Sequence, residues 1–275
     1  MTINCKGKLI DLTVPRVMGI VNITPDSFFA GSRHRHADEI IANVAQMIRD
    51  GAAFIDIGGY SSRPGAAFVS EQEEIRRVVP VVELLVAHFP DIMISVDTFR
   101  SEVARVCIQN GAAMINDISA GMLDDKMLAT VAGFQVPYIM MHMRGNPQTM
   151  QQFTHYEDVV REMLLYFSER IASARALGIN DLIADPGFGF SKTLAQNFEV
   201  LGKLGLFDTL EVPVLAGLSR KSMIQKTLGV DANDALNGTT VLNTIALAKG
   251  ASILRVHDVR EAVQAVQLVL ETGKA

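Results

Sequence analysis

Eight short apolar runs alternate with amphipathic segments along almost the whole chain, and this alternation constrains the fold more than any other feature. Each run is nearly continuous in Val, Ile, Leu, Met and Ala, as expected for strands of a parallel sheet that is buried on both faces. The segments between them repeat apolar residues every three to four positions, which is typical of helices that pack on such a sheet. The runs begin at Arg16, Ala52, Ile92, Ala112, Val136, Asn180, Val212 and Ala251.

This pattern of strand and helix predicts a TIM (β/α)8 barrel, and a length of 275 residues is usual for one such barrel. A doubly wound open sheet is the alternative, because the pattern does not give the strand order. No linker or change in composition interrupts the alternation, so we expect a single domain over residues 1–275. Residues 2–12 are expected to form a short N-terminal β-hairpin with Gly7 near its turn, and this hairpin could close the bottom of the barrel.

Some helix boundaries are marked in the sequence. Ser70 followed by Glu73 predicts a capping box at a helix start, and Gly51 is placed to end the first helix. One continuous helix is predicted from Leu194 to Phe207.

Composition argues against several classes of function. The net charge of −5 is unlike that of a general nucleic-acid binder, and the absence of Trp with only 6% aromatic residues argues against a base-stacking platform. No apolar run is long enough to cross a bilayer, and the first residues contain no signal-peptide segment, so we expect no membrane association. Cys5 and Cys107 belong to no CxxC pair or ligand cluster, which favours a reduced, cytoplasmic setting.

Polar residues recur at the points where the apolar runs end. In a barrel all these points lie on one rim, and that rim holds the active site of TIM-barrel enzymes. A single polar residue there often only caps the next helix, but the recurrence around the whole ring predicts a binding site. The residues are Asn22, Asp56, Asp97, Asn116, Asp117, His142, Asp185, Lys221, Arg255 and His257.

The cationic side chains at this rim suit an anionic ligand. Arg63, Lys221, Arg255 and His257 could hold phosphate or another multiply charged anion. For Arg63 the alternative is a solvated loop charge. For Arg220, the neighbour of Lys221, we favour an outward salt bridge.

The acidic and amide side chains suit a nitrogen-rich ring. Asp97, Asp185 and Asn116 offer acceptors and an amide, and a ring with amino-substituted nitrogens would supply the matching donors. The alternative is that Asp97 and Asp185 pair with Lys221 and Arg255 in an internal ion network. Both arrangements are compatible in the empty protein.

Metal ligands are sparse in the sequence. The amide oxygen of Asn22 is a candidate ligand for Mg²⁺, which takes few protein ligands besides phosphate oxygens and water. The histidines show no HxxxH or HExxH spacing, so we expect no zinc cage. His142, flanked by Met141 and Met143, is expected to be a buried structural histidine.

Eight motifs follow one another in order and span nearly the whole chain: VMGIVNITPDSFFAGS, DIGGYSSRPGA, SVDT, IND, MMHMRG, DPGFGF, GLSRKS and RVHDV. As a set they resemble the dihydropteroate synthase family. The resemblance implies a TIM barrel that joins 6-hydroxymethyl-7,8-dihydropterin diphosphate to 4-aminobenzoate. The products are 7,8-dihydropteroate and pyrophosphate, in folate biosynthesis. It also implies a dissociative displacement of diphosphate, Mg²⁺ as cofactor, sulfonamides as competitive inhibitors and a homodimer.

The resemblance further implies roles for individual residues. The pterin ring would be held by Asp97, Asn116, Asp185 and Lys221, with Arg255 stacked against it. The diphosphate would be bound by Asn22, with Mg²⁺, and by Arg63, Arg255 and His257. The aminobenzoate would be bound by Phe28, Ser62, Pro64, Phe190, Lys221 and Ser222. The implied catalytic residues are Asp97, Lys221 and Arg63.

The chain departs from the family pattern in two loops. The family commonly has GGESTRPG where this chain has Tyr60 and Ser62 in place of Glu and Thr. Ser62 keeps the hydroxyl, whereas Tyr60 replaces a carboxylate. In the first loop Phe29 and Ala30 replace a Ser-Asp pair. No pterin- or phosphate-binding group is lost, so we expect an active enzyme.

Three other functions remain open at this point. A Schiff-base aldolase barrel would use a neutral Lys221 as its nucleophile. A pterin-binding methyltransferase would share the acids but would not need Arg63 or His257 for a diphosphate. A non-catalytic pterin-binding paralogue is compatible with the altered loops.

Overall fold

Eight parallel strands form a barrel at the centre of the molecule. The computed structural model describes residues 1–23, 33–60 and 68–273. The strand order is β8-β7-β6-β5-β4-β3-β10-β9, and a parallel bridge between Ala184 and Val214 joins the two ends of this sheet. The order of a closed ring confirms the TIM barrel, and the open-sheet alternative is wrong. The barrel strands are β3 (Arg16–Asn22), β4 (Phe54–Gly58), β5 (Met93–Asp97), β6 (Met114–Asp117), β7 (Tyr138–Met141), β8 (Leu182–Asp185), β9 (Leu215–Ala216) and β10 (Ile253–Val256).

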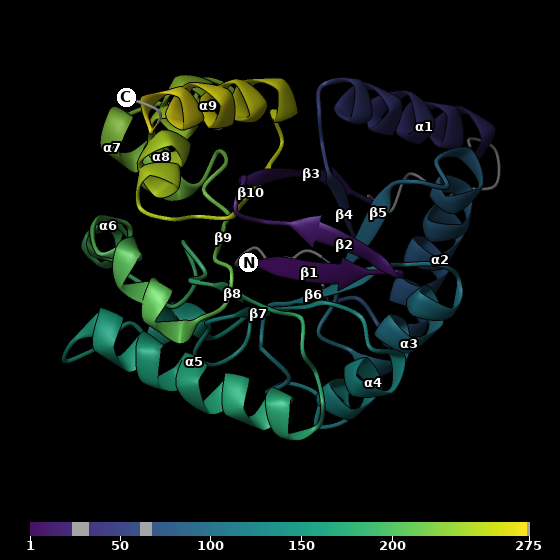
Figure 1. Ribbon diagram of the computed structural model, residues 1–275, viewed down its shortest axis with the longest axis horizontal. Helices are drawn as coiled ribbons and strands as arrows, with labels where there is room; N and C mark the ends of the chain where they lie inside the picture. The colour runs from purple at the N-terminus through teal and green to yellow at the C-terminus, as the bar shows by residue number, and fades with distance from the viewer. Residues whose placement is uncertain (24–32, 61–67, 274–275) are drawn as a thin grey trace.

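Helices surround the barrel on its outer side (Figure 1). Apolar strand residues that face outward, such as Val17, Ile55 and Val96, pack against these helices in the main hydrophobic core. The helices are α1 (Arg33–Arg49), α2 (Glu71–His88), α3 (Ser101–Gln109), α4 (Met127–Phe134), α5 (Val159–Ala176), α6 (Leu194–Gly202), α7 (Ser222–Leu228), α8 (Leu236–Ala248) and α9 (Val259–Thr272), with 3-10 segments η2 (Met150–Gln152) and η3 (Leu204–Leu210). Of the helices in this described part of the chain, none is long and apolar enough to cross a membrane.

The predicted N-terminal hairpin is present and lies across one end of the barrel (Figure 1). It consists of β1 (Thr2–Cys5) and β2 (Lys8–Asp11), which pair antiparallel. Ile3 and Cys5 are buried against inward-facing strand residues such as Met18 and Phe54. The hairpin therefore closes the bottom of the barrel, as expected, and leaves the opposite rim for the functional site.

The observed helix boundaries show which helix starts and ends could be predicted from local sequence signals. Ser70 accepts from the backbone N–H of Glu73, but the Glu73 carboxylate pairs with Arg76 and Arg77, so only half of the predicted capping box forms. The single helix predicted from Leu194 to Phe207 is wrong, because α6 ends at Gly202 and the chain continues as η3. Helix α7 was not among the helices expected from the sequence.

Candidate active site

A cavity of about 690 Å³ lies at the C-terminal rim of the barrel strands. Nine of the thirteen predicted site residues belong to the described part of the chain. Seven of them line this cavity: Asn22, Asp97, Phe190, Lys221, Ser222, Arg255 and His257. Asn116 and Asp185 are buried on β6 and β8. The other four, Phe28, Ser62, Arg63 and Pro64, lie outside the described residues.

Arg255 is the centre of a buried ion cluster. Its Nε donates to Asp56 Oδ2 at 2.6 Å, and its Nη2 donates to Asp97 Oδ2 at 2.9 Å. Asn116 Nδ2 also donates to Asp56 Oδ2, at 3.1 Å. These contacts join β4, β5, β6 and β10 at one level of the barrel. Asp56 was expected at the rim without a role of its own, and its buried carboxylate holds the Arg255 guanidinium in place.

For both Asp97 and Arg255, burial and the charge of the paired group act on the pKa in opposite directions, and both pKa values end above their ordinary values. Burial raises the pKa of Asp97 to about 7, although the charge of Arg255 opposes this rise. For Arg255, burial would lower the pKa, but the carboxylates of Asp56 and Asp97 outweigh burial and hold the pKa above its ordinary value. The guanidinium is therefore a permanent cation, whereas Asp97 can change charge near neutral pH.

Lys221 and Asp185 lie on the other side of the mouth. The Lys221 ammonium donates to the carbonyl oxygen of Phe188 and lies 4.8 Å from the centre of the Phe190 ring. Burial lowers the pKa of Lys221 to about 8, while Asp185 and Asp97 oppose this shift. Lys221 is therefore mostly charged at neutral pH.

Asp185 instead binds the backbone of the adjacent turn. Its Oδ1 accepts from the N–H of Gly187 at 2.8 Å, and burial raises its pKa while Lys221 opposes the rise. The alternative ion network is thus correct for Asp97 with Arg255. The second carboxylate bonded to Arg255 is Asp56, not Asp185.

His257 and Asn22 complete the described rim. His257 Nδ1 lies 2.9 Å from Ser219 Oγ, which also accepts from the backbone N–H of His257 at 3.2 Å. Asn22 is exposed at the last position of β3. The ring of His257 and the amide of Asn22 both line the cavity that contains Arg255.

Several polar residues near the rim are bound to neighbouring groups. Arg220 forms a bidentate pair with Asp258, at 2.9 and 2.7 Å, which confirms the predicted salt bridge, although Arg220 also belongs to the residues that line the cavity. His142 is 2% exposed and its Nδ1 contacts Lys192, so it is a buried structural histidine as expected. Asp117 accepts from the Tyr138 hydroxyl at 2.6 Å and has no place in the cavity lining.

Tyr60, one of the departures from the family pattern, packs at the edge of the cavity. Its ring meets Phe99 edge to face, with centroids 5.2 Å apart, and the Arg100 guanidinium lies 5.3 Å from its centre. Its hydroxyl accepts from Gln148 Nε2 at 2.8 Å. An aromatic ring with a hydroxyl thus links three loops at the position where the family commonly has a carboxylate.

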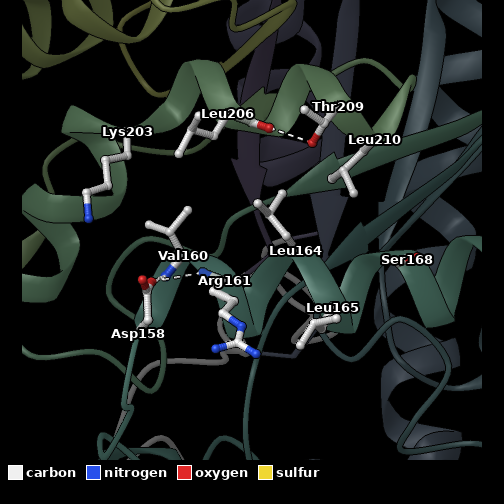
Figure 2. A pocket seen from close by; sticks show the side chains of 10 residues that line it. All are labelled: Asp158, Val160, Arg161, Leu164, Leu165, Ser168, Lys203, Leu206, Thr209 and Leu210. Atoms are coloured by element: carbon white, nitrogen blue, oxygen red, sulfur yellow. Dashed lines mark hydrogen bonds between the residues drawn. The ribbon is translucent and has the colours of Figure 1, made fainter.

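A second hollow, of about 420 Å³, lies between α5 and η3 (Figure 2). Four of its ten lining residues are leucines. The Asp158 carboxylate caps α5 and Thr209 bonds to the carbonyl of Leu206 (Figure 2). The charged groups with shifted pKa values in that lining, Asp158 and Lys203, are exposed, whereas Asp97 and Lys221 at the rim are partly buried, so the rim cavity is the candidate active site.

Comparison with known proteins agrees with this assignment. A family model described as pterin binding enzyme matches residues 18–257. Dihydropteroate synthase of Escherichia coli (strain K12) is 44% identical over 277 residues, which span 100% of this chain and 98% of the relative. A Yersinia pestis dihydropteroate synthase solved with a sulfonamide drug complex has a TM-score of 0.93 and 42% identity, with full coverage of both chains. A Xanthomonas albilineans dihydropteroate synthase solved with 4-aminobenzoic acid has a TM-score of 0.91 and 42% identity, covering 100% of this chain and 98% of that one.

The barrel, the rim site and the family match define this chain as a pterin-binding enzyme. With this degree of identity along its whole length, it belongs within that class to the dihydropteroate synthase family. The resemblance inferred from the motifs is therefore confirmed, and with it the assignment as a transferase.

Proposed function

We propose that this enzyme condenses 6-hydroxymethyl-7,8-dihydropterin diphosphate with 4-aminobenzoate, giving 7,8-dihydropteroate and pyrophosphate. The observation that carries the proposal is the convergence of Asp97, Arg255 and Lys221 on one cavity. Such a site offers carboxylate acceptors for a flat nitrogen ring and cations for the anion attached to it. Family membership and the complexes of the relatives support the same reaction.

The pterin ring is bound by the inner part of the site. The carboxylates of Asp97 and Asp185 accept from its ring nitrogens and amino group, and the side chain of Asn116 adds an amide. Lys221 donates to the ring, and Arg255 stacks on its face. The contacts of Arg255 with Asp56 and Asp97 support this role, because they hold the guanidinium in one orientation.

The diphosphate and the aminobenzoate occupy the outer part of the cavity. Arg255 and His257 contact the diphosphate, together with Arg63. Phe190, Lys221 and Ser222 bind 4-aminobenzoate, and sulfonamides compete with it there. Phe28, Ser62 and Pro64, which lie outside the described residues, complete this second subsite.

Bond cleavage precedes bond formation in the proposed mechanism. The bond between the methylene carbon and the diphosphate oxygen breaks, and its electron pair leaves with the diphosphate. The resulting cation is conjugated with the pterin ring, and ionised Asp97 stabilises it electrostatically. The amino group of 4-aminobenzoate then forms the new C–N bond and releases one proton to solvent.

Mg²⁺ fits the donor set of this rim. In the described residues no group of three His, Cys, Asp or Glu side chains could hold a metal ion, so a protein-only cage is not offered there. Asn22 contributes one amide oxygen at the cavity edge, and diphosphate oxygens with water would complete a shell that suits Mg²⁺. When bound, the ion supplies positive charge to the leaving diphosphate.

The assembly and setting of the enzyme are part of the same proposal. The enzyme is a homodimer, and the apolar helix α8, whose Val241 is 49% exposed, supports a subunit contact on that side. The enzyme works in the reducing cytoplasm, which suits two buried free thiols, Cys5 and Cys107.

A coupled assay tests the function directly. The purified enzyme is expected to release pyrophosphate only when the pterin diphosphate, 4-aminobenzoate and Mg²⁺ are all present. Pyrophosphate release that does not depend on 4-aminobenzoate would contradict the proposal. The aldolase alternative requires a neutral Lys221, which its pKa of about 8 disfavours at neutral pH. Borohydride trapping of a carbonyl substrate on Lys221 would support that alternative instead.

A further inference from the structure

Lys192 is a buried lysine that the proposed reaction does not use. The residue is 4% exposed. Its Nζ lies 3.1 Å from each of three acceptors, which are the carbonyl oxygens of Gly187 and Phe190 and Nδ1 of His142. An ammonium group has three N–H donors, so these acceptors use all of them. When the Lys192 ammonium donates to Nδ1, the neutral His142 ring carries its proton on Nε2.

The backbone that Lys192 holds is the turn Gly187–Phe190, which lies between two lysines. The N–H of Phe190 donates to the carbonyl of Gly187 at 3.1 Å and closes the turn. The carbonyl of Phe188 accepts from Lys221 on the cavity side, and the Phe190 ring lies against the same ammonium. Lys192 therefore binds, from the buried side, the turn that contacts Lys221 in the cavity.

This turn has little conformational preference of its own. Gly187 and Gly189 both have positive φ, at +65° and +85°, and glycine adopts many backbone conformations with similar energy. A Cβ at position 187 would lie 2.4 Å from the carbonyl oxygen of His142, so the glycine packs directly on the end of β7. External hydrogen bonds must then select one conformation, and Lys192 supplies two of them.

The packing around Lys192 gives no reason for a charged side chain at this buried position. Burial lowers the pKa of Lys192 to about 7, with Asp185 opposing the shift, and burial holds the pKa of His142 well below its ordinary value. The three hydrogen-bond acceptors of Lys192 are neutral groups. A buried ammonium is unfavourable unless its bonds are needed, which argues for a role in holding the turn.

We propose that Lys192 is a positioning residue for the aminobenzoate side of the site. By fixing the turn, it places the Phe190 ring and the Phe188 carbonyl against Lys221. The inference rests on the proposed function, since it takes Phe190 and Lys221 to line the aminobenzoate subsite. Lys192 itself touches no substrate.

The first experiment compares Lys192→Met with Lys203→Met in steady-state kinetics. Lys203 is a matched control, because its side chain is 48% exposed and pairs with Glu199 at the surface. In Lys192→Met the KM for 4-aminobenzoate is expected to rise about tenfold, as for the loss of other groups that orient a binding residue. The KM for the pterin diphosphate is expected to stay within about twofold, because Asp97 and Arg255 lie on other strands. Lys203→Met is expected to match the wild type.

A double-mutant cycle with Phe190→Leu separates positioning from general loosening. If Lys192 acts through the Phe190 ring, Lys192→Met raises the KM for 4-aminobenzoate less than about twofold when that ring is already absent. Lys192→Gln, which keeps two N–H donors, serves in place of the methionine variant if the latter does not fold. An unchanged KM for 4-aminobenzoate, an equal rise in both KM values, or a full tenfold effect in the Phe190→Leu background would overturn the proposal.

Backbone hydrogen exchange provides a readout that does not depend on turnover. Faster exchange at residues 187–190 is expected in Lys192→Met, with other segments unchanged. If the wild type fails the pyrophosphate assay but the variant still shows this local change, the turn is positioned by Lys192 and the proposed function is wrong. Unchanged exchange at the turn would overturn the inference while leaving the proposed function intact.

Discussion

The two ends of the barrel interior differ sharply in chemistry although the same strands build both. On β4, Phe54 fills the lower end and Asp56 joins the ion cluster above it. On β10, Ile253 lies in the lower apolar layer and Arg255 at the rim. Residues i and i+2 of a strand share one face, so each strand can supply core packing below and a binding group above. Along one strand, a residue that stabilises the core therefore lies only two positions before a residue that contributes to the site.

The two ends of the barrel contribute differently to the free energy of folding. The lower layer is sealed by the β1–β2 hairpin and gains from the burial of apolar surface. The upper layer buries charges, and Asp56 Oδ1 has no hydrogen-bond partner among the described residues. Buried charges contribute little to stability even when paired. The upper end is therefore organised for a ligand, and three substitutions or conditions test this comparison.

Phe54→Ala at the lower end is expected to have the largest effect on stability. Phe54 is 1% exposed, and the loss of its ring should leave a cavity and lower the free energy of unfolding by about 3–5 kcal/mol. At temperatures where the variant stays folded, kcat is expected to remain within about threefold of wild type, because no site contact is removed. Leu9→Ala on the exposed face of the hairpin is the control, with a change within about 0.5 kcal/mol. A variant that keeps its unfolding midpoint but loses activity would break the comparison.

Lys221→Ala at the rim is expected to lower activity strongly and to leave stability almost unchanged. Turnover should fall by about 100-fold or more, because a charge that contacts the turn and that we propose to contact the substrates is lost. The thermal midpoint should stay within a few degrees of wild type, as judged by circular dichroism. Lys226→Ala, at an exposed position on α7, the helix that Lys221 precedes, is expected to keep full activity. Wild-type rates in Lys221→Ala would refute its assigned role.

The fold was largely predictable from the sequence because its determinants are local. Strand β4 begins and ends within a continuous apolar run, and the Ser70 cap marks α2 without knowledge of any partner. Helix boundaries were harder to predict where the helix propensity of the residues is low. Helix α6 ends at Gly202, and Gly205 follows three residues later; glycine is a poor helix former, and the apolar periodicity continues through both positions. Helix α7 follows the rim loop directly and is too short for a clear period.

The sequence allowed us to predict which residues form the site, but not which of them pair with one another. The strand ends identified Asp97 and Arg255, yet the pair of Arg255 with Asp56 joins positions 199 residues apart. Local sequence carries no record of such a contact. Lys192 was missed because a lysine between Ser191 and Thr193 suggests a solvated helix start. The only available signal was its place directly after the glycine-rich turn that follows β8.

The smallest expected effect is a pH dependence that sharpens the role of the upper layer. Burial raises the pKa of Asp97 to about 7; Arg255 opposes this rise, and Asp56, Glu74 and Asp117 add to it. Only the ionised carboxylate accepts two sets of hydrogen bonds, so Asp97 loses its preferred form as pH falls through 7. The affinity for a pterin without phosphate groups, measured by calorimetry, should then fall roughly fivefold between pH 7 and 6. Asp97→Asn should bind more weakly and with a flat profile over this range. A wild-type affinity that is constant between about pH 7.5 and 5.5 would mean that Arg255 keeps Asp97 ionised throughout. The rim would then be as fixed in charge as the lower layer is in packing.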